Sequence, residues 1–233
     1  MLVLLTLAGC TVSVADCQSD EECSTAFGEG WTCAPEGGAC VNPGGTGDTA
    51  LDTIIPLLTI NEVLYDPSND DPEPEQPPPG DANGDGKYDL ADDEFVELVN
   101  VSGAILDISG YAVWDDEAWG LEQPRHIVPD GTVLEVGEAF VVFGGGVPTG
   151  SFGGAQVQVA NGGRLNLNNT GDTLRITRAD GRITLSFEIE PRSNNPNESY
   201  TRNPDIIGIF EQHAENTPIL FSPGTRVDGT PFR

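Results

Sequence analysis

The chain has 233 residues, and its hydrophobic content of 37% is enough for one packed domain with appendages. Its 29 glycines and 18 prolines are too many for a helical protein and favour short strands joined by turns. The chain has 38 acidic and only 10 basic residues, which gives a net charge of −28. Because this charge repels phosphate backbones, no direct binding of nucleic acid is expected.

The N-terminal residues 1–9 form an uncharged apolar run that is too short to span a bilayer and is typical of an export signal. The tetrapeptide Leu7-Ala8-Gly9-Cys10 resembles the bacterial lipobox, and this resemblance implies a lipid on Cys10 that anchors the chain to a membrane. No Lys or Arg precedes Cys10, and this departure from the usual basic start points to a true start farther upstream in a longer reading frame. The alternative to a lipoprotein signal is an ordinary secretory signal that happens to contain Cys10. The expected location is the bacterial cell envelope, as an outer-membrane lipoprotein facing the periplasm or the exterior, with secretion as the alternative.

All five cysteines lie within the first 40 residues, a pattern that favours an oxidising compartment. With Cys10 set aside, the segment 10–42 is predicted to hold two disulfides, which replace a core that so short a segment cannot build. Three connectivities remain open, and a zinc site is the weaker alternative because there is no CxxC pair and no nearby His. The predicted disulfide cysteines are Cys17, Cys23, Cys33 and Cys40.

Residues 43–56 begin as a Gly/Thr/Asp tether and are expected to link this segment to the main domain, residues 57–233. Several apolar segments of the main domain alternate with polar residues, and none shows a sustained helical period, which predicts an all-β antiparallel sandwich. The predicted strands are Leu57–Leu64, Phe95–Asn100, Leu106–Trp114, Gly131–Leu134, Ala139–Phe143, Arg164–Leu167, Thr173–Arg178 and Ile183–Ile189.

A series of short motifs in the main domain resembles the lamin-tail domain in its bacterial form. The motifs are INEVL within 57–64, EFVELVN at 94–100, DISGYAVW at 107–114, RHIVP at 125–129, GTVLEVGEAFVVFGGG at 131–146, NLNNTGDT at 166–173 and FSPGTRVDGTPF at 221–232. The resemblance implies an immunoglobulin-like β-sandwich that serves as an extracellular module and is not itself a catalyst. On this basis Glu62, Glu97 and His126 are interpreted as structural residues.

An acidic insertion, residues 66–93, separates the first two predicted strands and contains a calcium-loop pattern. In the twelve residues 81–92, acidic and amide side chains occupy positions 1, 3 and 5, and Gly86 at position 6 permits a sharp turn. Residues 61–97 hold 13 acidic residues against one Lys, a density that a bound cation would relieve. The predicted Ca²⁺ ligands are Asp81, Asn83, Asp85, the backbone carbonyl of Lys87, Asp89 and Asp92.

Asp92 stands where such loops usually carry a bidentate Glu, a departure that resembles dockerin and thrombospondin-type loops. We expect a weak, structural calcium site without a flanking pair of helices. The predicted function is therefore a non-catalytic binding, adhesive or scaffold module of the cell envelope, stabilised by calcium, with an unidentified protein or glycan partner. Two alternatives are an accessory subunit of an extracellular hydrolase or nuclease, and a hydrolase that uses a catalytic metal.

Overall fold

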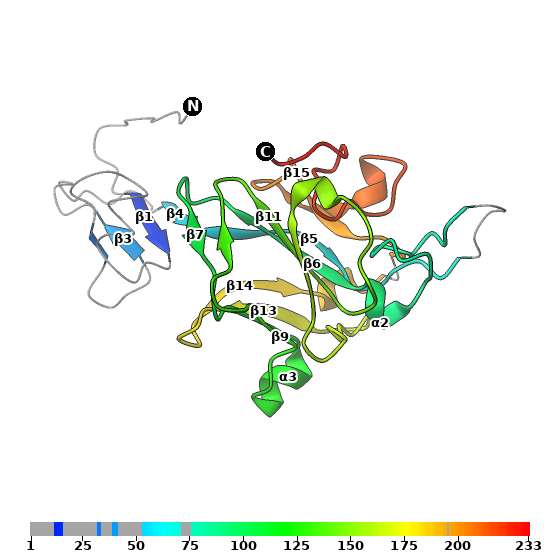
Figure 1. Cartoon of the computed structure of the whole chain (residues 1–233), viewed down its shortest axis with the longest axis horizontal. Coiled ribbons are helices and arrows are strands. Elements are labelled where there is room, and N and C mark those ends of the chain that lie inside the picture. The colour runs from blue at the N-terminus through cyan, green and yellow to red at the C-terminus, as the bar shows by residue number, and fades with distance from the viewer. Residues whose placement is uncertain (1–11, 16–31, 34–38, 42–52, 71–75, 195) are drawn as a thin grey trace. The chain divides into compact units, whose positions relative to one another are not determined.

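The computed structural model describes residues 12–15, 32–33, 39–41, 53–70, 76–194 and 196–233 (Figure 1). The chain divides into two compact units. The smaller unit comprises residues 1–57 with 101–104, and the larger one comprises 58–100 and 105–233. Among the described residues, no helix combines the length and apolar composition needed to cross a membrane.

The smaller unit contains a four-stranded sheet in the order β2-β3-β1-β4. Its strands are β1 (Val12–Ala15), β2 (Thr32–Cys33), β3 (Ala39–Val41) and β4 (Thr53–Pro56). The expected linker 43–56 is therefore shorter than predicted, because its apolar end pairs in parallel with β1. The backbone register places Cys33 opposite Cys40, whereas Cys10, Cys17 and Cys23 lie outside the described residues. The two disulfides stay a prediction.

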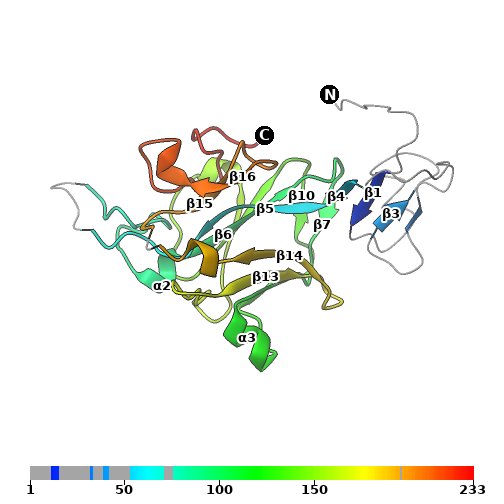
Figure 2. The ribbon, with the colours of Figure 1, turned by 180° about the vertical axis from the view of Figure 1, so that it is seen from behind.

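The larger unit is a sandwich of two main sheets, which appear as separate layers in Figure 2. The six-stranded sheet has the order β12-β11-β6-β5-β15-β16, and the four-stranded sheet has the order β14-β13-β8-β9. The strands of the first are β5 (Leu58–Leu64), β6 (Phe95–Asn100), β11 (Ala139–Phe143), β12 (Gln156–Val159), β15 (Tyr200–Asn203) and β16 (Ile209–Gln212). The strands of the second are β8 (Ala112–Trp114), β9 (His126–Ile127), β13 (Thr173–Thr177) and β14 (Ile183–Glu188).

Short elements complete the larger unit. A two-stranded ribbon joins β7 (Leu106–Asp107) to β10 (Val133–Leu134). The α-helices are α2 (Leu90–Asp93) and α3 (Asp116–Leu121), and the 3₁₀ turns are η1 (Phe152–Gly154), η2 (Glu190–Arg192) and η3 (His213–Glu215).

The main core lies between the two sheets and draws buried side chains from both of them. Leu98 and Phe140 contribute from the six-stranded sheet, and Leu174 and Ile176 from the four-stranded one, each with 1% or less of its surface exposed. Burying these apolar side chains supplies the main favourable contribution to folding.

A second apolar cluster covers the outer face of the six-stranded sheet. It contains Leu64, Phe95, Val141 and Phe143 together with Ala82, which belongs to the acidic insertion. The four-stranded sheet thus covers one face of β5, β6 and β11, irregular segments cover the other, and every residue of these strands is buried. This continuous burial explains why the alternation expected of half-buried strands is absent here.

The all-β sandwich is confirmed, but individual elements differ from the prediction. The predicted strand Leu106–Trp114 breaks into β7 and β8 at a turn around Gly110, whose φ is 73°. The predicted strand Arg164–Leu167 is wrong, because Asn166 adopts a left-handed φ of 60° that a strand excludes. The parallel pairing of β12 with β11 and the strands β9, β15 and β16 were not predicted.

The same Leu→Ala substitution at a buried and at an exposed position tests the assigned core. Leu174→Ala removes a side chain with no exposed surface and is expected to lower the free energy of unfolding by about 2–5 kcal/mol. The matched variant Leu121→Ala, at a position with 59% of its surface exposed, is expected to change it by less than about 0.5 kcal/mol. Chemical denaturation of both variants checks this, and equal effects would contradict the assigned core.

Candidate functional site

The segment 81–92 curls through a series of short contacts between its own side chains and backbone. Gly86 N donates to Asp81 Oδ2 at 2.9 Å, Asp85 N donates to Asn83 Oδ1 at 3.0 Å, and Lys87 N donates to Asp85 Oδ1 at 3.0 Å. Gly84 and Gly86 have φ values of 72° and 89°, which glycine adopts without a steric penalty. The sequence pattern therefore corresponds to a tight turn that gathers these polar side chains on one segment.

The end of the segment is shaped by Asp89, which caps the helix α2. The Asp89 Oδ1 atom accepts hydrogen bonds from Ala91 N at 2.9 Å and Asp92 N at 3.3 Å. A four-residue helix thus follows the loop, and no helix precedes it within the described residues 76–80. The loop has no flanking pair of helices in this part of the chain, and Asp89 has a structural role that the sequence did not suggest.

Asp93 ties the two halves of the loop together. Its Oδ1 accepts from Asn83 N at 3.1 Å, and its Oδ2 accepts from Asp89 N at 2.8 Å. Burial raises the pKa of Asp93 to about 6, against the lowering effect of these backbone donors. The ligand pattern of the sequence does not include Asp93, because nothing in the pattern distinguishes a buried acid from its less buried neighbours.

The loop rests on the triglycine segment, residues 144–146, which follows β11. Gly145 N donates to Asp92 O at 3.1 Å, and Thr149 N donates to Asn83 O at 2.8 Å. A Cβ atom added to Gly144 would lie 1.8 Å from Ala91 O, and one added to Gly145 would lie 2.0 Å from Asp92 Oδ1. Gly144 therefore permits a close approach of two backbones, and Gly145 leaves room for the Asp92 side chain.

The predicted calcium ligands are placed on one loop but are not drawn into a compact cluster. Asp81, Asn83 and Asp85 lie on the curl, Asp92 lies against Gly145, and Lys87 is exposed. Among the residues that the structure describes, no three His, Cys, Asp or Glu side chains meet as a group that could hold a metal ion. One feature fits a cation: Asp81 Oδ1 is buried and has no hydrogen-bond partner among the described residues.

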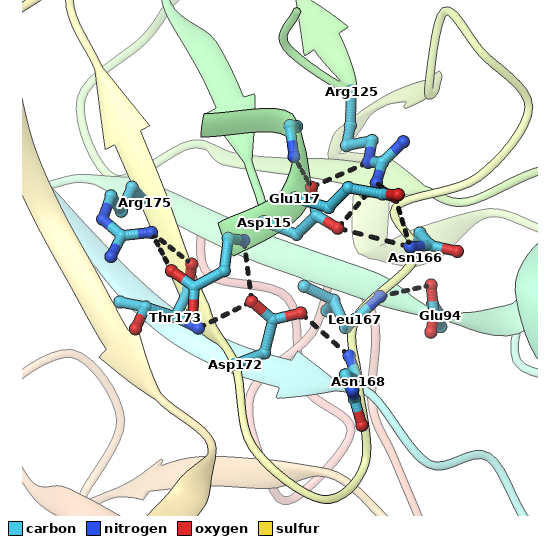
Figure 3. A network of polar contacts seen from close by, with 12 residues as sticks. Glu94, Asp115, Glu117, Arg125, Asn166, Leu167, Asn168, Asp172, Thr173 and Arg175 are labelled. Carbon is cyan, nitrogen blue, oxygen red and sulfur yellow. Dashed lines mark hydrogen bonds and ion pairs between the residues drawn. The ribbon is translucent and has the colours of Figure 1, made fainter. Parts of the chain in front are cut away.

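A second network of carboxylates holds the loop 164–172 (Figure 3). Asp172 accepts hydrogen bonds from the backbone of Asn168 at 2.9 Å and of Asp116 at 2.8 Å, and Glu94 Oε2 accepts from Leu167 N at 3.3 Å. Burial raises the pKa of Glu94 to about 8. These carboxylates fix an irregular loop beside α2, where the sequence had suggested a strand.

The neighbouring ion pair fastens α3 to the same region. Asp115 caps α3 through Ala118 N and also binds Arg125 with both of its carboxylate oxygens, at 2.8 and 2.7 Å. Asp115 further accepts from the Asn166 side-chain amide at 3.3 Å. Trp114 packs edge-on against Trp119 in this region, with ring centres 5.2 Å apart.

Glu62 and Glu97, adjacent on β5 and β6, are fully buried and bind the C-terminal segment. Glu62 Oε2 accepts from Ser222 Oγ at 2.8 Å, and Glu97 Oε2 accepts from Gly224 N at 2.6 Å. Burial raises the pKa of both carboxyl groups; the neighbouring Glu62 raises that of Glu97 further, and His213 opposes the rise at Glu62. Their structural interpretation stands, with Ser and backbone donors in the place of the expected Arg.

His126 also has a structural environment. It is 2% exposed, and its Nε2 lies 2.8 Å from Gln158 Oε1, a contact that joins β9 to β12. Burial lowers the pKa of His126, so the neutral imidazole is favoured.

The fold and these sites define an immunoglobulin-like β-sandwich, whose polar groups serve to fix irregular segments on its faces. The sequence profile of the Lamin Tail Domain family matches residues 55–190, more than half of the chain. The chain therefore belongs to the lamin tail domain family, an immunoglobulin-like family that is not enzymatic. No curated protein matches the sequence.

Adding a methyl group to the triglycine segment tests the docking of the loop. Gly144→Ala is expected to lower the free energy of unfolding by about 1–3 kcal/mol, because the Cβ has no room beside Ala91 O. The control Gly162→Ala, at an exposed glycine with no atom within 4 Å of the added Cβ, should leave stability nearly unchanged. Denaturation curves that do not separate the two variants would contradict the close approach.

The buried pair Glu62 and Glu97 predicts a stability that depends on pH. Their pKa values are raised in the folded state, so the folded protein holds protons that the unfolded chain releases above about 4.5. Stability is therefore expected to fall as pH rises from 4.5 through the raised pKa values. Glu97→Gln should flatten this slope in melting curves, whereas the exposed control Glu135→Gln should not. A wild-type stability that increases over this range would refute the assignment.

Proposed function

We propose that this protein is a non-catalytic binding module displayed at the bacterial cell envelope, in which a bound Ca²⁺ stabilises the loop 81–92 against the sandwich. The single observation that carries the calcium proposal is the buried, unpartnered Oδ1 atom of Asp81, at the first position of the ligand pattern. A buried carboxylate oxygen without a donor is costly, and a hard cation would compensate it.

The residues that would hold the ion are those of the sequence pattern. Asp81, Asp85, Asp89 and Asp92 offer carboxylate oxygens, and Asn83 and Lys87 offer a side-chain amide oxygen and a backbone carbonyl. An all-oxygen set selects a hard cation, and flexible coordination favours Ca²⁺ over Mg²⁺. The ion would supply positive charge to a loop whose twelve residues contain a single basic one, Lys87.

The electrostatic environment supports the same conclusion. The pKa of Asp92 is raised by burial and by the negative charges of Asp89 and Asp85, so like charges already oppose one another across the loop. A divalent cation bound between these carboxylates would attract each of them and so offset their mutual repulsion. The loop would then be held by charge as well as by the Asp93 and triglycine contacts.

The envelope location and the lipid anchor at Cys10 rest on the N-terminal sequence. The short apolar run and the lipobox-like tetrapeptide support export and attachment through lipid. A family of non-enzymatic immunoglobulin-like domains supports binding or scaffolding as the role of the exported part. The Cys-rich segment between them would act as a short, cross-linked spacer.

Calcium is expected to raise the melting temperature of the full chain, because it would bind only the folded loop. The gain in stability is about 2.7 kcal/mol at a hundredfold excess over Kd. Asp85→Asn should remove most of the shift, and the control Asp130→Asn, in an exposed turn, should keep it. If melting curves in EDTA and in calcium coincide for the folded wild-type protein, the calcium part of the proposal is wrong.

A further inference from the structure

A cleft of about 500 Å³ opens between the end of the acidic loop and the loop 164–172. One wall is formed by residues 89–91 with Glu94, and the other by residue 164 and residues 166–169. Six of the nine lining residues have polar side chains, namely three asparagines, one arginine and two acids: Asn166, Asn168, Asn169, Arg164, Asp89 and Glu94. A concave site with a few convergent polar groups is the usual form of a small-ligand site.

Each of the three asparagine side chains is held by the protein through one half of its amide. Asn166 Nδ2 donates to Asp115 at 3.3 Å, Asn168 Oδ1 accepts from Thr170 N at 3.0 Å, and Asn169 Nδ2 donates to Asp66. The other half of each amide has no partner among the described residues. The protein therefore orients these groups and leaves Asn166 Oδ1, Asn168 Nδ2 and Asn169 Oδ1 available.

The backbone beneath these side chains is fixed as well. Asp172 holds Asn168 N, and Glu94 holds Leu167 N, so the loop needs no strand partner to keep its shape. Glu94 is 3% exposed and contributes to the lining, and its Oε2 accepts from Leu167 N. Because the loop is already ordered, it would lose less conformational entropy when a ligand binds.

The available atoms combine acceptors with donors. Asn166 Oδ1 and Asn169 Oδ1 accept, whereas Asn168 Nδ2 and the exposed Arg164 guanidinium donate. An anion, which only accepts, would be repelled by the acceptors and by Asp89. A cation, which only donates, would be repelled by Arg164. Neighbouring hydroxyl groups both donate and accept, and they match the whole set.

We propose that this cleft binds a neutral sugar residue of a glycan, through hydroxyl groups that pair with the three asparagine amides and Arg164. The inference rests on the proposed function of the chain as a binding module and names its ligand class. The aliphatic side chain of Leu90, 45% exposed at the wall, offers an apolar surface to the carbon face of the sugar ring. No aromatic residue lines the cleft, so hydrogen bonds would carry the recognition.

The test uses the full chain and a panel of neutral disaccharides built from glucose, galactose, mannose or N-acetylglucosamine. Binding is followed by chemical-shift changes of the backbone amides. At least one disaccharide is expected to give saturable shifts confined to residues 89–94 and 164–169. Asn168→Asp keeps the acceptor for Thr170 but loses the Nδ2 donor, and is expected to weaken binding at least tenfold. Asn161→Asp, outside the cleft, keeps the acceptor for Ile127 N and should bind as the wild type does.

Parallel titrations use sulfated disaccharides, uronic-acid disaccharides and a basic peptide. The proposal is overturned if no neutral disaccharide shifts these amides, if Asn168→Asp binds like the wild type, or if an anionic sugar or the peptide occupies the cleft instead. Repeating the titration in calcium and in EDTA separates the two proposals. If calcium raises the melting temperature but no sugar binds, only the sugar-binding proposal is refuted. If a sugar binds but calcium leaves the melting temperature unchanged, only the calcium proposal is refuted.

Discussion

The structure depends on buried carboxylates that accept hydrogen bonds from the backbone of irregular segments. Glu62 and Glu97 hold the C-terminal segment, Asp93 holds the acidic loop, and Glu94 and Asp172 hold the loop 164–172. These segments lack strand partners for the donors concerned, and a buried N–H without an acceptor is costly. The acidic side chains thus replace the hydrogen bonds that regular secondary structure would supply, and they let long connections cover the faces of the sandwich.

This arrangement has an electrostatic consequence. Burial raises the pKa values of Glu62, Glu97 and Glu94, so part of the stability depends on protons that these groups hold. The acids of the loop 81–92 are less deeply buried, since Asp81, Asp85 and Asp92 are half-buried and Asp89 is exposed, and in our proposal a hard cation compensates them. Deeply buried acids that keep protons and loop acids that would bind calcium are two responses to the same excess of negative charge.

The sequence predicted the sandwich because the strands that carry it, such as β6, β11 and β13, combine β-branched and aromatic residues with turn residues at their ends. It did not predict β15 and β16, whose segments Tyr200–Asn203 and Ile209–Gln212 are short and polar enough to resemble loops. The ligand pattern of the acidic loop was visible because it is local in sequence. The roles of Asp93 and Gly144 were not, since that of Asp93 depends on its burial and that of Gly144 on a contact with Ala91, which is distant along the chain. A glycine triplet directly after a strand was the one available sign of a close backbone approach.

Amide hydrogen exchange, measured residue by residue in the native protein, tests the central claim most directly. If buried carboxylates hold the irregular segments, the amides that donate to them should exchange nearly as slowly as those of the central strands. The decisive amides are those of Asn83, Asp89, Leu167, Asn168, Ser222 and Gly224. Exchange of these amides at the rate of an exposed turn, while the strands stay protected, would contradict the account.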